Sequence, residues 1–212
     1  MADYLDYAER ICDRESLQVQ LSFVALFIGM FEFMKDTLLS KVESFLCGDM
    51  TQNKNGEWVY IHNDAYTNGI EKRLVDGKIV KDRLRNTVLW LKDAGAITED
   101  DYELFRKLRE KRNSYTHKMT QHVWDGLSEK DVEGLSDLLD LYTKIDKWWI
   151  NEIEIPTSGE FGPGSYDEDR VESMALLTFK MMINTLFGGE SEEYLEMIQE
   201  LRKQQGDNTY RS

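Results

Sequence analysis

Hydrophobic residues along most of the chain recur at spacings of three and four, which is the pattern of amphipathic helices. The first long pattern runs from a cap at Ser16 to about Phe45, and its centre, Leu21–Met34, is apolar on nearly every side. Leu21–Met34 is shorter than a membrane span, and Glu32 interrupts its end, so we predict a central core helix. A shorter amphipathic helix is predicted over residues 3–14.

The helical pattern breaks between residues 47 and 70, where asparagine and glycine are frequent. This composition predicts a long irregular loop, with a short strand at 58–62. A loop of that length in a compact protein is often functional or mobile. A turn at 75–78 then leads into a predicted helix that begins near Ile79 and ends at Gly95.

Capping residues mark the starts of the later helices. Thr98, followed by acidic residues, predicts a helix that runs to about His122. Ser128 is expected to cap the next helix, which should end before Pro156. The composition of residues 156–165 is that of a connector. Two acidic helices are predicted beyond it, over Asp167–Phe187 and Ser191–Gln204.

These elements predict an all-α fold, because no β-rich region is long enough to form a substantial sheet. At 212 residues, one helical domain over 1–212 is the expected organisation. We expect a helical bundle core at about 16–150, an irregular loop insertion near 47–70 and a C-terminal helical extension at about 165–204.

The overall charge opposes general nucleic-acid binding. The chain has 26 basic and 40 acidic residues and a net charge of −14, so a bulk basic footprint is absent. Cys12 and Cys47 lack the spacing of a metal site and are expected to be reduced thiols. The acidic start of the sequence has no apolar signal region. We therefore expect a cytoplasmic protein that does not associate with a membrane.

One segment has the opposite charge. Between Arg106 and Lys118 there are six basic residues and one acidic residue, a local net charge of +5. Such a contrast with the acidic remainder suggests a focused site for an anionic ligand. Arg83, Arg85 and Lys81 form a smaller basic group, which is more typical of a solvated helix face.

An arginine lies within the apolar stripe of this segment. Phe105, Leu108, Arg112, Tyr115 and Met119 recur at helical spacing and should share one face. A guanidinium group stays protonated in a protein, so burying it without a partner is costly. Either a carboxylate meets Arg112 inside the fold, or the stripe faces a cleft or a partner.

Two further polar residues follow at one-turn spacing. Asn113 and His117 are four residues apart, and Arg109 extends their face towards the start of the helix. These residue types suit RNA cleavage without a metal, since RNA carries its own nucleophile, the 2′-hydroxyl group. Histidine can transfer the protons, arginine can stabilise charge on the phosphate, and asparagine can orient either group. We therefore predict no metal site and no cofactor.

The stretch "LREKRNSYTH" resembles the R-N-x-x-x-H signature of the HEPN superfamily. The resemblance covers the motif and its surrounding helices, at about 16–150. It implies a helical bundle and a metal-independent endoribonuclease of phage defence, toxin–antitoxin or stress systems. It also implies a homodimer in which two motifs form a composite active site. Arg112 and His117 match the catalytic pair, and Asn113 matches the polar residue beside the arginine.

The remaining assignments depend on this hypothesis. The predicted substrate-binding residues are Arg109, Lys111, Tyr115, Lys118 and His122, although His122 also fits an ordinary surface position. One HEPN subgroup has a modified tyrosine where this chain has Met119, so that regulatory partnership is not implied. A cognate antitoxin or another regulator remains a predicted partner. The alternative is a non-catalytic scaffold in which the motif binds a nucleotide or satisfies buried carboxylates.

Overall fold

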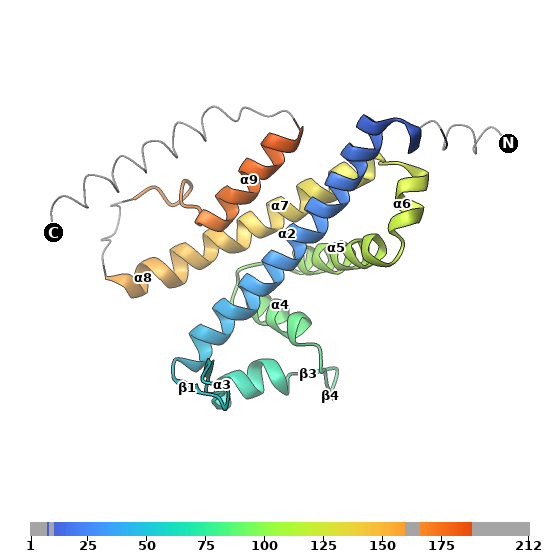
Figure 1. Cartoon of the computed structure of the whole chain (residues 1–212). Helices are drawn as coiled ribbons and strands as arrows, with labels where there is room; N and C mark the ends of the chain where they lie inside the picture. The colour runs from blue at the N-terminus through green and yellow to red at the C-terminus, as the bar shows by residue number, and fades with distance from the viewer. Residues whose placement is uncertain (1–7, 9–10, 160–165, 188–212) are drawn as a thin grey trace.

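The computed structural model describes residues 8, 11–159 and 166–187, and this part of the chain is a helical bundle with two small hairpins (Figure 1). The all-α fold class is thus confirmed. The helices are α2 (Arg14–Cys47), α3 (Asp64–Tyr66), η1 (Thr67–Glu71), α4 (Arg83–Asp93), α5 (Glu99–His117), α6 (Met119–Asp125), α7 (Glu129–Trp149), η2 (Ile150–Glu154), α8 (Ile155–Ser158) and α9 (Met174–Phe187), of which η1 and η2 are π-helical. The strands are β1 (Met50–Gln52), β2 (Trp58–Tyr60), β3 (Leu74–Val75) and β4 (Lys78–Ile79).

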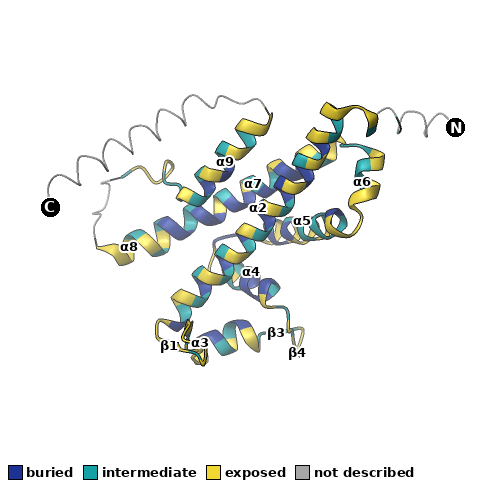
Figure 2. Ribbon diagram, viewed as in Figure 1, coloured by how far each residue is buried: buried dark blue, intermediate teal, exposed yellow. Residues whose placement is uncertain are grey.

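Helix α2 lies at the centre of the bundle and contacts α4, α5, α6, α7 and α9 (Figure 1). Phe27, Met30, Met34 and Val42 on this helix are completely buried. Figure 2 shows further buried residues where α2 meets α5 and α7. By length and composition alone α2 could cross a membrane. In the fold most apolar residues of Leu21–Met34 are buried in the protein core, as the sequence pattern predicts, but Leu21 and Phe33 are each 40% exposed.

The start of α2 lies before the predicted cap. Asp13, not Ser16, is the N-cap residue, and its carboxylate accepts hydrogen bonds from the backbone N–H groups of Glu15 and Ser16. The Ser16 hydroxyl instead accepts a hydrogen bond from the Gln20 side chain. An upstream carboxylate with two acceptor oxygens thus replaces the serine as the cap. Most of the predicted helix at 3–14 lies outside the described residues.

The region predicted as a long loop is largely ordered into small elements. Strands β1 and β2 pair in antiparallel register, with Met50 opposite Tyr60, so the predicted short strand is confirmed at Trp58–Tyr60. Asn63 then caps α3 by accepting a hydrogen bond from the N–H of Tyr66. Tyr66 and Ile70 are buried in the core. Polar composition concealed these elements because each is only a few residues long.

The predicted turn at 75–78 joins β3 to β4. Asp76 and Gly77 both have positive φ, of 52° and 74°, a left-handed conformation that suits a tight hairpin turn. The following helix begins at Arg83 rather than near Ile79, because Asp82 caps it through the N–H of Arg85. The helix ends at Asp93, and Gly95, with φ of 85°, follows its C-cap Ala94 and stops it as predicted.

Helix α5 starts as predicted and ends early. Thr98 and Asp101 form a capping box at its start. The helix stops at His117 instead of His122, because the backbone of Lys118 leaves the helical region, with φ −127° and ψ 31°. Helix α6 then begins in a new direction, and Met119, 39% exposed, leaves the apolar stripe.

The C-terminal boundaries also differ from the prediction. Ser128 caps α7 as expected, but the helical path continues beyond Pro156 through η2 and α8. Pro156 is tolerated because it lies in the first turn of α8, where an N–H group is not needed. Helix α9 begins at Met174 instead of Asp167, and the predicted helix over Ser191–Gln204 lies outside the described residues.

Candidate functional site

Arg112 meets a carboxylate at the contact between α5 and α2. Its Nη2 atom forms an ion pair with Glu32, and its Nη1 atom donates a 2.9 Å hydrogen bond to Oδ1 of Asn113. Glu32 also pairs with Lys35 on its own helix. Burial raises the pKa of Glu32, but hydrogen bonding and charge from Lys35 and Arg112 outweigh burial and lower it. The intramolecular carboxylate is therefore one of the two solutions that the sequence allows for Arg112.

The role of Glu32 was missed by sequence reasoning. Glu32 was interpreted only as an interruption of an apolar helix, although a carboxylate at the edge of a core requires a cation or hydrogen-bond donors. The side chains of Arg112 and Glu32 are 26% and 28% exposed, so the pair lies at the edge of the core. Within the part of the chain that is described, Nε of Arg112 is buried and has no hydrogen-bond acceptor.

Lys111 and Tyr115 connect α5 to the start of α7. The buried Tyr115 donates a 2.6 Å hydrogen bond to Oδ1 of Asp131, and Nζ of Lys111 lies 3.1 Å from the same oxygen. Burial raises the pKa of Tyr115. Burial acts in the same direction on Asp131, but hydrogen bonds from Ser128, Tyr115 and Lys111 outweigh it, so the pKa of Asp131 is lowered. Lys111 and Tyr115, which the sequence predicts to bind substrate, thus both contact Asp131 inside the fold.

A glycine on α7 makes room for the Lys111 side chain. A Cβ atom at Gly134 would lie only 2.7 Å from Nζ of Lys111. The missing side chain therefore leaves the room in which Lys111 reaches Asp131 and the backbone oxygen of Lys130.

Arg109 likewise has an internal role. Its Nη1 atom lies 2.5 Å from Oδ2 of Asp82, the residue that caps α4. Burial raises the pKa of Asp82, but bonds from the Arg109 guanidinium and the Arg85 N–H group lower it overall. Arg109 thus fixes the start of α4 against α5.

His117 and Lys118 differ from these anchored residues. Both are exposed at the end of α5, and neither side chain has a hydrogen bond or ion pair within the described residues. Asn113 is half-buried one turn before His117. Arg112 and His117 are five positions apart on the helix, which places their Cβ atoms about 140° apart around the helix axis. The structure therefore brings Arg112 to Asn113 but does not bring Arg112 to His117.

His122 folds back on α5 instead of joining His117. Its Nε2 atom is 2.9 Å from Oγ of Ser114, and its ring packs edge-on against Tyr115 with centroids 4.6 Å apart. The break at Lys118 produces this arrangement by redirecting α6. His122 is consequently a contact between α6 and α5.

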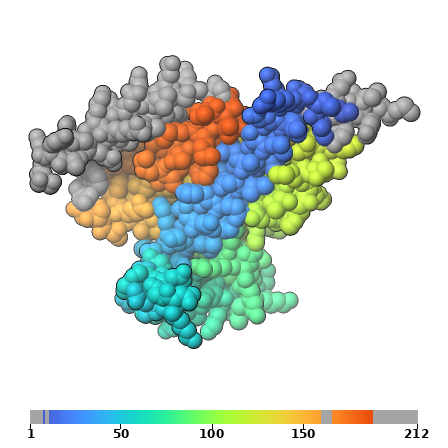
Figure 3. Space-filling model, in the orientation of Figure 1, coloured from blue at the N-terminus to red at the C-terminus, as the bar shows by residue number. Residues whose placement is uncertain are grey.

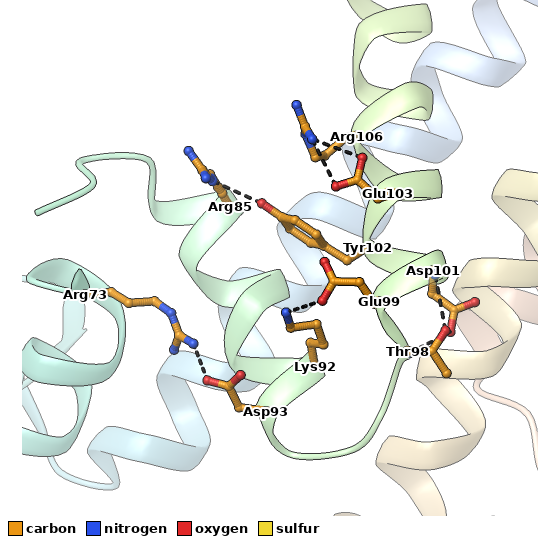
Figure 4. A network of polar contacts seen from close by, with 10 residues as sticks. All are labelled: Arg73, Arg85, Lys92, Asp93, Thr98, Glu99, Asp101, Tyr102, Glu103 and Arg106. Atoms are coloured by element: carbon orange, nitrogen blue, oxygen red, sulfur yellow. Dashed lines mark hydrogen bonds and ion pairs between the residues drawn. The ribbon is translucent and has the colours of Figure 1, made fainter. Parts of the chain in front are cut away.

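Most of the positive charge on α5 is paired with acidic residues. Arg106 pairs with Glu103 on α5 itself, and Figure 4 shows this pair beside others that join α4, α5 and their neighbours. The other paired cations of the basic segment are Arg109, Lys111 and Arg112. Lys107 and Lys118 have no carboxylate partner in the ranges that the structure describes. The local sequence charge of +5 therefore overstates what this face offers to an anion.

Comparisons with known proteins do not assign the site. No family model matches the chain, and no curated protein or solved structure matches it. Among the described residues, no group of three or more His, Cys, Asp or Glu side chains is placed to hold a metal ion. The HEPN interpretation rests on Arg112, Asn113 and His117, which all lie on α5.

Proposed function

We propose that the protein is a HEPN-type, metal-independent endoribonuclease, with a role in phage defence, a toxin–antitoxin pair or a stress response. The observation that carries the proposal is that His117 is exposed, with a side chain that has no partner among the described residues, one turn after Asn113, which accepts a hydrogen bond from Arg112. An accessible imidazole can exchange protons with a bound substrate. The asparagine amide and the guanidinium provide the polar groups that a phosphate requires.

In the proposed reaction His117 takes the proton from a ribose 2′-hydroxyl group, and the 2′-oxygen attacks the adjacent phosphorus atom. The bond from phosphorus to the 5′-oxygen breaks, and this leaving oxygen receives a proton from an imidazolium group. The products are a 2′,3′-cyclic phosphate and a 5′-hydroxyl group. Arg112 stabilises the negative charge that develops on the phosphate oxygens.

A second copy of the chain completes this scheme. One motif supplies a single His117, whereas proton removal and proton donation are simplest with two histidines. Arg112 and His117 also point in different directions from one α5, so one site can combine the arginine of one copy with the histidine of another. We therefore retain the symmetric homodimer, an inhibitory antitoxin or regulator, and a cytoplasmic location as parts of the proposal.

The test compares wild-type protein with the His117→Ala and Arg112→Ala variants, each incubated with mixed RNA in EDTA. We expect wild-type cleavage that leaves 2′,3′-cyclic ends, and a loss of about 10²–10⁴-fold in rate for His117→Ala. His62→Ala is the matched histidine control, because His62 pairs with Glu43 and Glu71 far from the motif in sequence. Equal cleavage by wild type and His117→Ala would disprove the catalytic assignment.

A non-catalytic scaffold is the second candidate, and the Glu32–Arg112 pair favours it. In a scaffold this pair is simply a satisfied polar contact at the edge of the core. Expression separates the two functions, because a ribonuclease should be toxic to cells and His117→Ala should relieve the toxicity. A scaffold should be equally well tolerated with either residue at position 117.

A further inference from the structure

An apolar groove lies where α2, α7 and α9 come together. It encloses a cavity of about 410 Å³. Its walls include Val19 and Phe23 of α2, Val132 and Leu139 of α7, and Phe187 of α9. Val19, Val132 and Phe187 are 47%, 59% and 41% exposed, which is high for apolar side chains that lie together.

The apolar surface continues around α9. A second hollow of about 270 Å³ is bordered by Leu26 of α2 and by Met182 and Leu186 of α9. Figure 3 shows α9 lying along α2 on this face of the molecule. Within α9 only Leu176 and Phe179 are buried, although most of its residues are apolar. The bundle therefore leaves an elongated apolar surface uncovered.

The border of the groove is acidic. Glu129, Glu133 and Asp140 are exposed on α7, and helical geometry places them within about 100° of Val132 around the helix axis. In the described ranges, none of the three carboxylates has a cationic partner. Lys180 of α9 does not neutralise this border, because it pairs with Glu172.

We propose that this groove binds an amphipathic helix of a partner protein, with apolar residues on one face and lysine or arginine residues along its flank. Helices that bind in grooves place apolar anchors one turn apart, and the uncovered surface offers apolar walls for such anchors. Basic flanking residues complement the carboxylates on α7. A second copy of this chain fits less well, because its net charge is −14. The segment after α9 has the same disadvantage, since residues 190–200 include five glutamates.

The probe is a fluorescein-labelled, two-heptad peptide of leucine and lysine that forms an amphipathic helix, titrated against the full chain and followed by fluorescence anisotropy. Two peptides serve as controls: a scrambled peptide of the same composition, and one with glutamate in place of lysine. We expect only the amphipathic lysine peptide to bind, and more weakly as salt increases. Binding of all three peptides alike, or of none, would overturn the proposal.

Variants locate the binding surface. Val132→Asp should weaken binding by about tenfold or more, since a carboxylate enters an apolar contact. Val132 is already exposed, so the variant should fold, and circular dichroism checks this. Leu74→Asp, at a 64% exposed position on β3, is the matched control and should bind as wild type does. The combined Glu129→Lys and Glu133→Lys change should weaken binding by charge alone.

Two other outcomes assign the groove to another occupant and contradict the proposal. A dimer in light scattering that Val132→Asp dissociates would identify a second copy as the occupant. Peptide binding that appears only in a chain ending at Phe187 would identify the residues that follow as the occupant. Neither outcome depends on RNA cleavage, so the groove and the α5 motif are tested separately.

Discussion

The basic face of α5 and the acidic border of α7 carry opposite charges and also differ in how the fold treats them. Arg109, Lys111 and Arg112 each meet a carboxylate from another helix or its cap. Glu133 and Asp140 meet no cation within the described part of the chain. A local surplus of charge in a sequence therefore does not show that the charge is available to a ligand. The neighbours that the fold supplies decide its availability.

The difference follows from position relative to the core. The cations of α5 project beside apolar residues that pack on α2 and α7, where an unpaired charge is costly. Carboxylates on the outer side of α7 remain in water and need no partner. Four measurements test whether paired and unpaired charges differ in this way.

The largest effect should come from Asp131→Ala. The change removes the capping box at Ser128 and leaves the buried hydroxyl of Tyr115 without its acceptor. Together these losses should lower the free energy of unfolding by about 2–4 kcal/mol. Glu133→Ala, two residues along the same helix, should change it by less than about 0.5 kcal/mol. Urea unfolding measures both, and equal losses would contradict the distinction between paired and unpaired acids.

Acid should expose the same difference. The folded-state pKa of Asp131 is lowered, so the unfolded chain binds more protons in acid and stability falls as the pH falls. The contribution is complete above the usual aspartate pKa of about 3.9 and declines below it. Asp131→Asn should therefore flatten the fall in stability between neutral and acidic pH. An unchanged slope in this variant would show that other carboxylates, such as Asp82, cause the acid sensitivity.

A double-mutant cycle on Glu32→Gln and Arg112→Gln tests the pair at the edge of the core. We expect a coupling energy of about 1 kcal/mol, since both side chains are about a quarter exposed and partly screened by solvent. The matched cycle combines Glu32→Gln with Lys107→Gln. Lys107 has no carboxylate partner among the described residues, so this cycle should give no coupling. Coupling near zero for Glu32 and Arg112 would show that this ion pair adds nothing measurable to the stability of the fold.

The smallest effect is expected for Arg106→Ala. Arg106 is exposed, and its one ion pair with the residues that the structure describes is with Glu103 on its own helix. Such a pair is screened by salt and restrained little by the fold, so the unfolding midpoint should stay within experimental error of wild type. A measurable loss of stability would show that surface ion pairs on α5 stabilise the fold more than their exposure indicates.

Local signals in the sequence are sufficient to predict where α5 and α7 start. Thr98 and Ser128 cap α5 and α7 as predicted, because a capping box involves residues only three apart. The predicted end of α5 at about His122 is wrong, because the backbone of Lys118 leaves the helical region without a glycine or proline to mark the break. The consequence for the site is that His122 contacts Ser114 and Tyr115 on α5.

The sequence predicts that Arg112 needs a partner from elsewhere in the fold, but it does not predict which residue that partner is. The position of Arg112 on an apolar stripe indicated that a carboxylate, a cleft or a partner had to meet it. The identity of that group depended on how α5 crosses α2, which places Glu32 beside the guanidinium. Sequence spacing within one helix contains no information about that crossing. The same limitation hid Asp82 and Asp131 as partners of the α5 cations.

The central position of α2 also has a consequence for protein synthesis. α2 leaves the ribosome before every other described helix that covers it, and roughly 100 residues separate its end from the end of α7. At ordinary rates of translation this interval lasts about 5–20 s. During that time the apolar side chains of α2 meet their native neighbours one helix at a time, and Phe27 stays without its partner Tyr115 until α5 emerges. We therefore expect the nascent chain to expose apolar surface to chaperones until α7 emerges.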